Sequence, residues 1–212
     1  MKIRIALLSL PLVCVSFLPI FAQVATETET GSAKKDDGAA VSKMEEAKAP
    51  LKFAVADGNL MFETTGDWQS VKPKSRMLEF EIKVPKVEGD ETDGRLTVMG
   101  AGGSIAANIQ RWEGQFSQAD GSATKAKTEE LTIDQMKITM IDVEGAFTQT
   151  MGGPFSGGKK VKLEDQRMLS AIIQTPKNGN YFIKLVGPAA TIKANEDEFK
   201  KMIKGVQLKA SE

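Results

Sequence analysis

The stretch that most resembles a binding motif runs from Val98 to Phe116 and reads VMGAGGSIAANIQRWEGQF. A short apolar strand leads into a turn that contains Gly102 and Gly103, and Ser104 then has the side chain of a helix N-cap. Amide groups at the start of a helix attract anions, so this turn could bind a phosphate or a carboxylate. Anion binding is therefore the first chemistry that the sequence suggests.

Nucleotide binding would be the specific form of this chemistry, and Ile105 argues against it. The dinucleotide fingerprint needs a small residue at that position, in the first of several repeated parallel strand–helix units. The predicted helix instead carries Asn108, Arg111 and Gln115 in one row, at spacings of three and four residues. This row and the glycine turn form the first candidate binding surface, and a purely structural turn is the alternative that the pattern favours.

The glycine-rich segment at residues 149–166 is a second candidate contact region, and it is predicted to be the longest loop of the folded part. It carries Phe155 close to Lys159, Lys160 and Lys162. An exposed phenyl ring beside lysines could contact a partner or an anionic surface. Long ordered loops are uncommon unless they are functional or mobile, so a plain flexible loop is the alternative.

Other reactive side chains support weaker hypotheses. The segment from Val87 to Gly94 contains four carboxylates, but their order lacks the ligand spacing of an EF-hand, so an acidic turn is favoured over a calcium site. Lys184 or Tyr181 could act with carboxylates in an enzyme or a small-molecule binder, with the glycine turn as an anion hole. A general acid and base, however, must be paired in a pocket. We predict no metal site and no cofactor.

The composition excludes several classes of protein. The chain has no histidine, and its one cysteine, Cys14, lies in the leader described below. The mature protein therefore cannot hold a Ser-His-Asp triad, a thiolate nucleophile or a zinc site with Cys or His ligands. The 28 basic and 28 acidic residues cancel, and no basic face alternates with aromatics, so nucleic-acid binding is not predicted.

Residues 1–22 have the layout of a secretory signal peptide. Lys2 and Arg4 precede an apolar run that ends at Phe21, and Ala22 precedes polar sequence. We expect cleavage after Ala22, a secreted or periplasmic protein, and no transmembrane segment after cleavage. A retained anchor is the alternative, which the shortness of the apolar run disfavours.

The mature chain divides into a linker and one domain. Residues 23–50 lack aromatic side chains and a sustained apolar period, which predicts a disordered linker. Residues 51–212 are long enough to form a single domain stabilised by its apolar core. The hairpin strands at 167–175 and 181–187 have apolar residues on both parities, so both faces of their sheet should be covered. The other expected elements are strands at 77–84 and 95–99, a helix at 104–116, an extended segment at 128–148 with a β-bulge or bend near Asp142, and a helix at 192–204.

Five segments of the chain carry a recognisable sequence pattern: Gly102–Phe116, Gly145–Phe147, Met151–Pro154, Arg167–Ile173 and Phe182–Thr191. Together they resemble a family of exported bacterial proteins similar in fold to the PsbP/Mog type. That fold is an α/β/α sandwich, seen in the extrinsic PsbP subunit of photosystem II and in a Ran-binding nuclear import factor. The resemblance covers roughly residues 60–208 and implies an α+β domain, with a mainly antiparallel sheet flanked by helices on both faces. It also implies a non-catalytic interaction domain, and it transfers no metal site.

Three functions follow from these patterns. The first is an exported, non-catalytic binding or accessory domain for an unknown protein or small ligand in the cell envelope. The alternatives are a small-molecule or anion-binding protein, or an enzyme that uses carboxylates or lysine, and beyond these a structural domain of the cell envelope. The candidate binding residues are Gly102, Gly103, Asn108, Arg111, Gln115, Phe155, Lys159 and Lys160.

Overall fold

The structure is a computed structural model that describes residues 48–151 and 159–209. All of the described residues belong to one compact unit, Glu45–Glu212. The predicted signal peptide and nearly all of the predicted linker lie outside the described residues, and so does Phe155.

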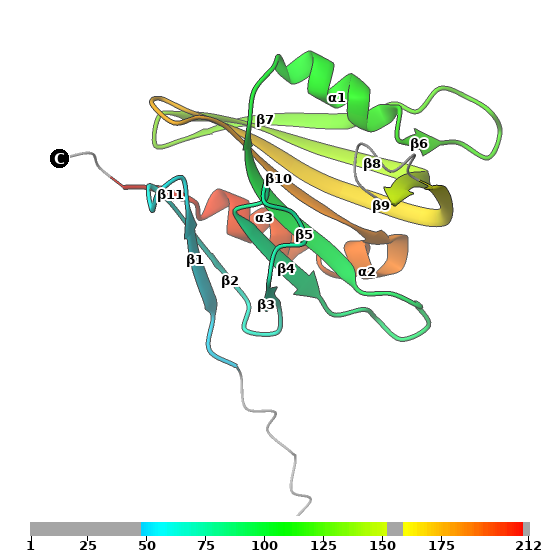
Figure 1. Cartoon of the computed structure of the whole chain (residues 1–212), viewed down its shortest axis with the longest axis horizontal. Helices are drawn as coiled ribbons and strands as arrows, with labels where there is room; N and C mark the ends of the chain where they lie inside the picture. The colour runs from blue at the N-terminus through cyan, green and yellow to red at the C-terminus, as the bar shows by residue number, and fades with distance from the viewer. Residues whose placement is uncertain (1–47, 152–158, 210–212) are drawn as a thin grey trace, which may run out of the picture. The chain divides into compact units, whose positions relative to one another are not determined.

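The described part of the chain is mostly antiparallel sheet with a few short helices (Figure 1). Its strands are β1 (Leu51–Val55), β2 (Leu60–Thr64), β3 (Gln69–Val71), β4 (Phe80–Val84), β5 (Gly94–Ala101), β6 (Phe116–Ser117), β7 (Lys127–Ile133), β8 (Met136–Met151), β9 (Lys159–Thr175), β10 (Gly179–Pro188) and β11 (Gln207–Leu208). Its helices are α1 (Ile105–Glu113), α2 (Ala189–Ala194) and α3 (Glu196–Lys204).

The described residues form two sheets. A small sheet has the strand order β1-β2-β11, and a large sheet has the order β3-β4-β5-β10-β9-β8-β6, with β7 also paired to β8. This confirms the predicted α+β fold with a mainly antiparallel sheet. The small sheet was not predicted, because β11 is only two residues long and joins β2 from the far end of the chain.

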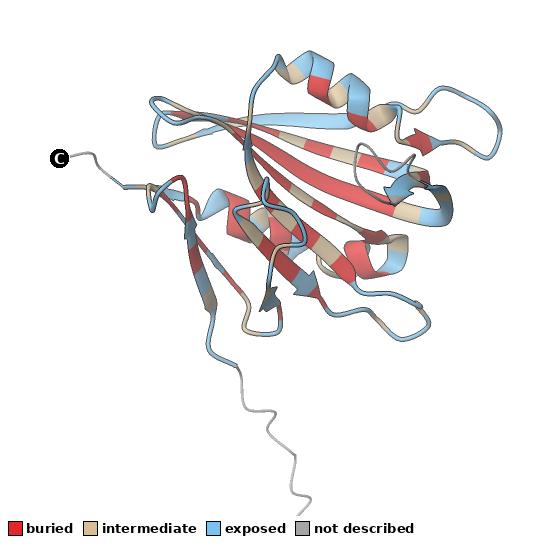
Figure 2. Ribbon diagram, viewed as in Figure 1, coloured by how far each residue is buried: buried red, intermediate tan, exposed pale blue. Residues whose placement is uncertain are grey.

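Both faces of the large sheet carry buried apolar side chains, because residues alternate between the faces along each strand. On β10, Ile183 belongs to the cluster that contains Phe199 of α3, whereas Phe182 belongs to the cluster that contains Trp112 of α1. The rings of Phe182 and Trp112 meet edge to face, with centroids 5.4 Å apart. Each such side chain contributes about 1.5–3 kcal/mol when fully buried. Figure 2 shows the buried residues along the central strands and on parts of the helices.

The described residues form three short helices, and the predicted three-layer α/β/α sandwich stays a prediction. Helix α1 begins where predicted, with the Ser104 hydroxyl accepting a hydrogen bond from the Ala107 amide at 3.2 Å. It ends at Glu113, however, and Phe116 lies in β6 instead of the helix. The C-terminal helix is divided into α2 and α3 at Asn195, whose side-chain oxygen accepts a hydrogen bond from the Trp68 indole at 2.9 Å.

The extended segment at 128–148 is a hairpin, and the irregularity that was predicted near Asp142 lies further along the strand. Asp134 and Gln135 have positive φ angles of 45° and 67°, and they turn the chain between β7 and β8. Strand β8 runs through Asp142 in regular register, and its register shift lies at Gly145 and Phe147. The apolar parity changes at Asp142 because Met136 and Ile138 face one core cluster while Ile141 and Val143 face the other.

The predicted long loop at 149–166 is shorter than expected. Strand β8 continues to Met151 and β9 begins at Lys159, with Thr150 paired to Lys160. The hairpin between β9 and β10 agrees with the prediction, and Gly179 at its turn has a φ of 74°. At the other hairpin the Asp165 backbone has a φ of 51°, which accommodates the register shift opposite Gly145.

The acidic segment at 87–94 serves local structure. An Asp90 carboxylate oxygen accepts hydrogen bonds from the amide and hydroxyl of Thr191 at the start of α2. Asp93 accepts from the Lys86 amide at 3.0 Å. Within residues 48–151 and 159–209, no group of three or more Asp, Glu, His or Cys side chains is placed to hold a metal ion, and no helix is long and apolar enough to span a bilayer.

Candidate functional site

A groove of about 860 Å³ lies beside the C-terminal end of α1. It is on the same face of the large sheet as the one against which α1 packs. Strands β4, β5 and β10 supply side chains to its base, and the paired ends of β8 and β9 lie along its side. We call it the basic groove. The lining residues that define it here are Lys72, Lys74, Glu81, Lys83, Asp93, Arg95, Thr97, Gln115, Phe147, Thr148, Gln149, Thr150, Lys160, Leu163, Gln166, Lys184 and Val186.

The basic groove carries more positive than negative charge. Six of its lining side chains are basic and two are acidic. Both acids are bound to basic neighbours: Arg95 holds Glu81, and Lys83 Nζ lies 3.6 Å from Asp93 Oδ2. The remaining positive groups on the lining are the ammonium groups of Lys72, Lys74, Lys160 and Lys184.

The pair formed by Glu81 and Arg95 shapes the base of the groove. Arg95 Nε and Nη2 donate to the two carboxylate oxygens of Glu81 at 2.8 and 3.0 Å, and the Lys74 amide adds a third hydrogen bond. Glu81 is 2% exposed. The Arg95 hydrogen bonds lower the pKa of Glu81 against the opposing effect of burial, so this carboxylate stays charged and holds Arg95 in place.

A row of polar side chains crosses the middle of the sheet beneath the groove. Cross-strand pairing joins Glu81 to Thr97, Thr97 to Lys184, and Lys184 to Ser170. Ser170 is fully buried, and its hydroxyl has no hydrogen-bond partner among the described residues. Polar groups in a sheet interior cost free energy compared with apolar ones, so core packing alone does not explain this row.

Lys184 is the central member of the row. It is the only charged residue of β10, and the alternation of the strand turns it to the same side as Phe182. Its Nζ donates to Gln115 Oε1 at 2.8 Å and lies 5.2 Å from the ring centroid of Phe147 and 5.9 Å from that of Trp112. Among the described residues, no carboxylate lies within 4.0 Å of this ammonium group.

The surroundings of Lys184 disfavour its positive charge. Burial, and to a smaller extent the nearby charges of Arg111 and Arg95, together lower the pKa of Lys184 to about 8. A negatively charged group placed in the groove would remove this penalty, because it would supply the missing counter-charge. The geometry and electrostatics together thus favour an anion as the occupant.

The residues predicted from the sequence divide into two groups. Gln115 and Lys160 line the basic groove, and Arg111 adds positive charge next to Lys184 without lining it. The others lie elsewhere or serve the glycine turn. Gly102, Gly103 and Asn108 form the start of α1 outside the groove lining, Lys159 is exposed, and Phe155 lies outside the described residues.

Asn108 is structural in this arrangement. It is buried, and its amide nitrogen donates to the carbonyl oxygens of Gly102 at 3.3 Å and Ser104 at 3.0 Å. Its oxygen accepts a hydrogen bond from Arg111 at 2.8 Å. Asn108 and Arg111 therefore stabilise the first turn of α1, whereas Gln115, the third member of the predicted row, lies beyond the end of the helix and binds Lys184. Gly103 has a φ of 93°, and a side chain there would approach the Asn108 amide.

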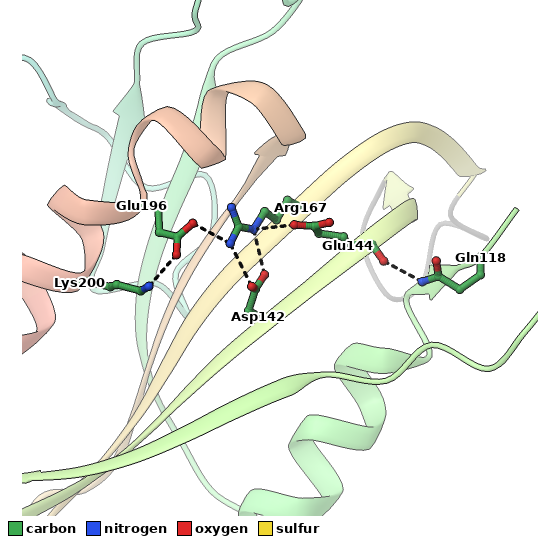
Figure 3. A network of polar contacts seen from close by, with 6 residues as sticks. All are labelled: Gln118, Asp142, Glu144, Arg167, Glu196 and Lys200. Atoms are coloured by element: carbon green, nitrogen blue, oxygen red, sulfur yellow. Dashed lines mark hydrogen bonds and ion pairs between the residues drawn. The ribbon is translucent and has the colours of Figure 1, made fainter.

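A second polar cluster surrounds Arg167 on the opposite side of the sheet (Figure 3). The side chain of Arg167 is 8% exposed, and its guanidinium contacts Asp142, Glu144 and Glu196 at 2.8–3.1 Å. Glu196 also accepts from Lys200 at 2.6 Å. Because every charged group here has a partner, this cluster ties α3 to β8 and β9 and offers no open coordination position.

Sequence reasoning missed most of the groove. Its base combines residues from β4, β5 and β10 whose proximity depends on strand order, and Lys184 lies 69 residues from its partner Gln115. One local signal was present. Lys184 interrupts the apolar run YFIKLV, and a charge inside a doubly buried strand indicates either a partner or a site.

No protein-family model and no curated protein matches the chain. Among the solved structures that resemble it is the solution structure of cyanobacterial PsbP (CyanoP) from Synechocystis sp. PCC 6803, with 11% sequence identity and a TM-score of 0.48, covering 84% of this chain and 98% of that chain. A crystal structure from Bacteroides thetaiotaomicron VPI-5482 has 12% identity and a TM-score of 0.36, covering 76% of this chain and 48% of that chain. A PsbP structure is thus among the similar ones, as the sequence resemblance predicted. At these identities the likeness concerns the fold alone, and it assigns no ligand or partner.

Proposed function

We propose that this chain is an exported, non-catalytic binding domain with an accessory role, and that its basic groove binds an anionic small molecule. The observation that carries the proposal is the charge of the groove. Its two acids are already held by basic neighbours, and Lys184 lies at its base without a carboxylate partner in the described part of the chain. An anion in this position would supply the missing counter-charge.

The size and lining of the groove support a small organic anion. A cavity of about 860 Å³ falls within the range of about 300–1,000 Å³ that is usual for small-molecule sites. Phe147, Leu163 and Val186 add apolar surface, while Thr97 and Gln166 add hydrogen-bonding groups. A carboxylate or phosphate attached to a short carbon skeleton would match both parts of this lining.

Binding is favoured over acid–base catalysis. A general acid and base need two titratable groups that both reach the substrate. Glu81 is occupied by Arg95, and Asp93 is bound to Lys83 and to the Lys86 amide. The carboxylates that line the groove are thus committed to structural partners.

Export and architecture belong to the same proposal. The basic and apolar leader at residues 1–22 supports secretion or a periplasmic location. The separate packing of Trp112 and Phe199 in different core clusters supports an α/β/α arrangement.

Removing positive charge from the groove should weaken anion binding. We expect the wild-type protein to bind citrate, and the triple variant Lys72→Gln, Lys74→Gln, Lys160→Gln to bind it at least about tenfold more weakly, equivalent to about 1.4 kcal/mol. These three lysines are exposed and line the groove, so their loss should leave the fold intact. Isothermal titration calorimetry at low and high salt would measure the effect, which screening should reduce.

The matched control carries the same change in net charge away from the groove. Lys137→Gln, Lys177→Gln and Lys193→Gln alter three exposed lysines that do not line it, so this triple variant should bind citrate like the wild type. Equal affinities for both triple variants, or no binding of citrate, phosphate and 2-oxoglutarate to the wild type, would contradict the proposal.

A further inference from the structure

The amine of Lys184 differs from the other lysine amines of the basic groove in its surroundings. Its Nζ is held by an amide oxygen, Gln115 Oε1, and lies near the rings of Phe147 and Trp112. The amines of Lys72, Lys74 and Lys160 belong to exposed residues, where water stabilises the ammonium form. The groove therefore combines several cations at its rim with a poorly hydrated amine at its base.

Among the described residues, none of the elements packed against Lys184 places a carboxylate within ion-pair distance of its amine. Helix α1 contributes Arg111, β5 contributes Arg95, and β8 contributes the apolar ring of Phe147. Burial and the two guanidinium groups lower the pKa of Lys184 to about 8. About one tenth of this amine is then neutral at pH 7, about 300 times the fraction for a lysine of ordinary pKa.

We propose that Lys184 forms an imine with the carbonyl group of an anionic aldehyde or 2-oxo acid bound in the basic groove. This inference rests on the proposed function and narrows its ligand class. The ammonium groups of Lys72, Lys74 and Lys160 would hold the carboxylate or phosphate of the ligand, and its carbonyl carbon would meet the Lys184 amine. A neutral lysine in a desolvated site is a nucleophile toward carbonyl compounds.

The reaction needs no reagent beyond the ligand. The lone pair of Nζ forms a bond to the carbonyl carbon, and the carbonyl oxygen takes up a proton to give a carbinolamine. The carbon–oxygen bond then breaks, and the oxygen leaves as water with both protons of the original amine. The product is a C=N bond between the ligand and Nζ.

Reductive trapping would test this inference on the full mature chain. The protein is incubated at pH 7 with glyoxylate and sodium cyanoborohydride, which delivers a hydride to the imine carbon and makes the link permanent. Peptide mass mapping then measures the labelling rate of each lysine. We expect Lys184 to be labelled at least tenfold faster than Lys193, an exposed lysine on α2 that serves as the control within the same molecule.

A conservative variant separates reactivity from folding. Gln115→Glu places a carboxylate where the amide oxygen now accepts the Lys184 hydrogen bond, and it keeps the size of the side chain. The negative charge should stabilise the ammonium form, so we expect labelling of Lys184 at pH 7 to slow by at least tenfold and its rise with pH to move to higher pH. Labelling of Lys193 should not change.

Two results would overturn the inference. One is labelling of Lys184 at or below the rate of Lys193 in the wild type, a result that does not depend on any variant. The other is an unchanged Lys184 rate in a folded Gln115→Glu protein. The imine can fail while the proposed function stands. If citrate and glycolate bind in the groove but Lys184 forms no adduct, the groove is an anion site and the imine is rejected.

Discussion

Replacing Arg167 by methionine should lower the free energy of unfolding by about 3–5 kcal/mol, the usual cost of removing one partner from a buried ion pair. The side chain of Arg167 is 8% exposed, and its guanidinium forms ion pairs with the carboxylates of Asp142, Glu144 and Glu196. Methionine fills much of the same volume but removes the cation that contacts Asp142, and it leaves Glu196 with Lys200 alone. Urea denaturation followed by circular dichroism would measure the loss.

The matched control is Arg76→Met. Arg76 is exposed and forms no ion pair within residues 48–151 and 159–209, so this change should shift the free energy of unfolding by less than about 0.5 kcal/mol. A loss below about 1 kcal/mol for Arg167→Met would mean that the cluster in Figure 3 is solvated in solution and does not tie α3 to the sheet.

The same cluster should respond to acid. Hydrogen bonds from Lys200 and then Arg167 lower the pKa of Glu196 in the folded protein below its usual 4.5. The unfolded chain then binds more protons in this range, so the stability from Glu196 is complete above about pH 4.5 and is lost as the pH falls through its folded value. The Arg167→Met variant should show a shallower loss of stability between about pH 5 and 3 than the wild type.

Replacing Lys184 by methionine should change stability in the opposite direction. We expect it to raise the free energy of unfolding at pH 7 by about 1–3 kcal/mol. Burial and two neighbouring guanidinium groups lower the folded pKa of Lys184 from 10.5 to about 8. Below pH 8 the folded protein carries this unfavourable charge, and methionine removes it while retaining contact with Phe147 and Trp112. We expect the variant to lose affinity for citrate as it gains stability.

The pH dependence distinguishes this cause from improved packing. Between about pH 8 and 10.5 the unfolded chain holds more protons on Lys184 than the folded protein does, so the wild type gains stability relative to the variant as the pH rises. The advantage of Lys184→Met should therefore be complete below pH 8 and vanish above about pH 10.5. Lys193→Met is the control for an exposed lysine, and an advantage that does not change with pH would reject the electrostatic explanation.

The sequence by itself determined the features that depend on neighbouring residues. The hairpin of β9 and β10 was predicted because Asn178 and Gly179 give a turn signal between two strands that have apolar residues on both faces. The start of α1 was predicted because Ser104 is a local cap. The absence of histidine excluded whole classes of chemistry without any structure.

Errors arose where tertiary contacts overrode these local patterns. The parity change at Asp142 suggested a bulge, but β8 is regular there because its two halves pack against different core clusters. The helix predicted at 192–204 divides at Asn195, where the side chain binds Trp68 from 127 residues away. The predicted loop at 149–166 is largely strand, because pairing between β8 and β9 orders its two ends.

The basic groove was decided by tertiary structure alone. The charge of the groove depends on which charged groups are paired. The negative charge of Glu81 is neutralised by Arg95 on the neighbouring strand, whereas Lys184 contacts the Gln115 amide oxygen and two aromatic rings, none of which is charged. Strand order brings these groups together, and burial then changes how each one holds its proton. A sequence gives the type and spacing of such groups, but the strength of their charges depends on distance and on the loss of water, and only the folded chain sets both.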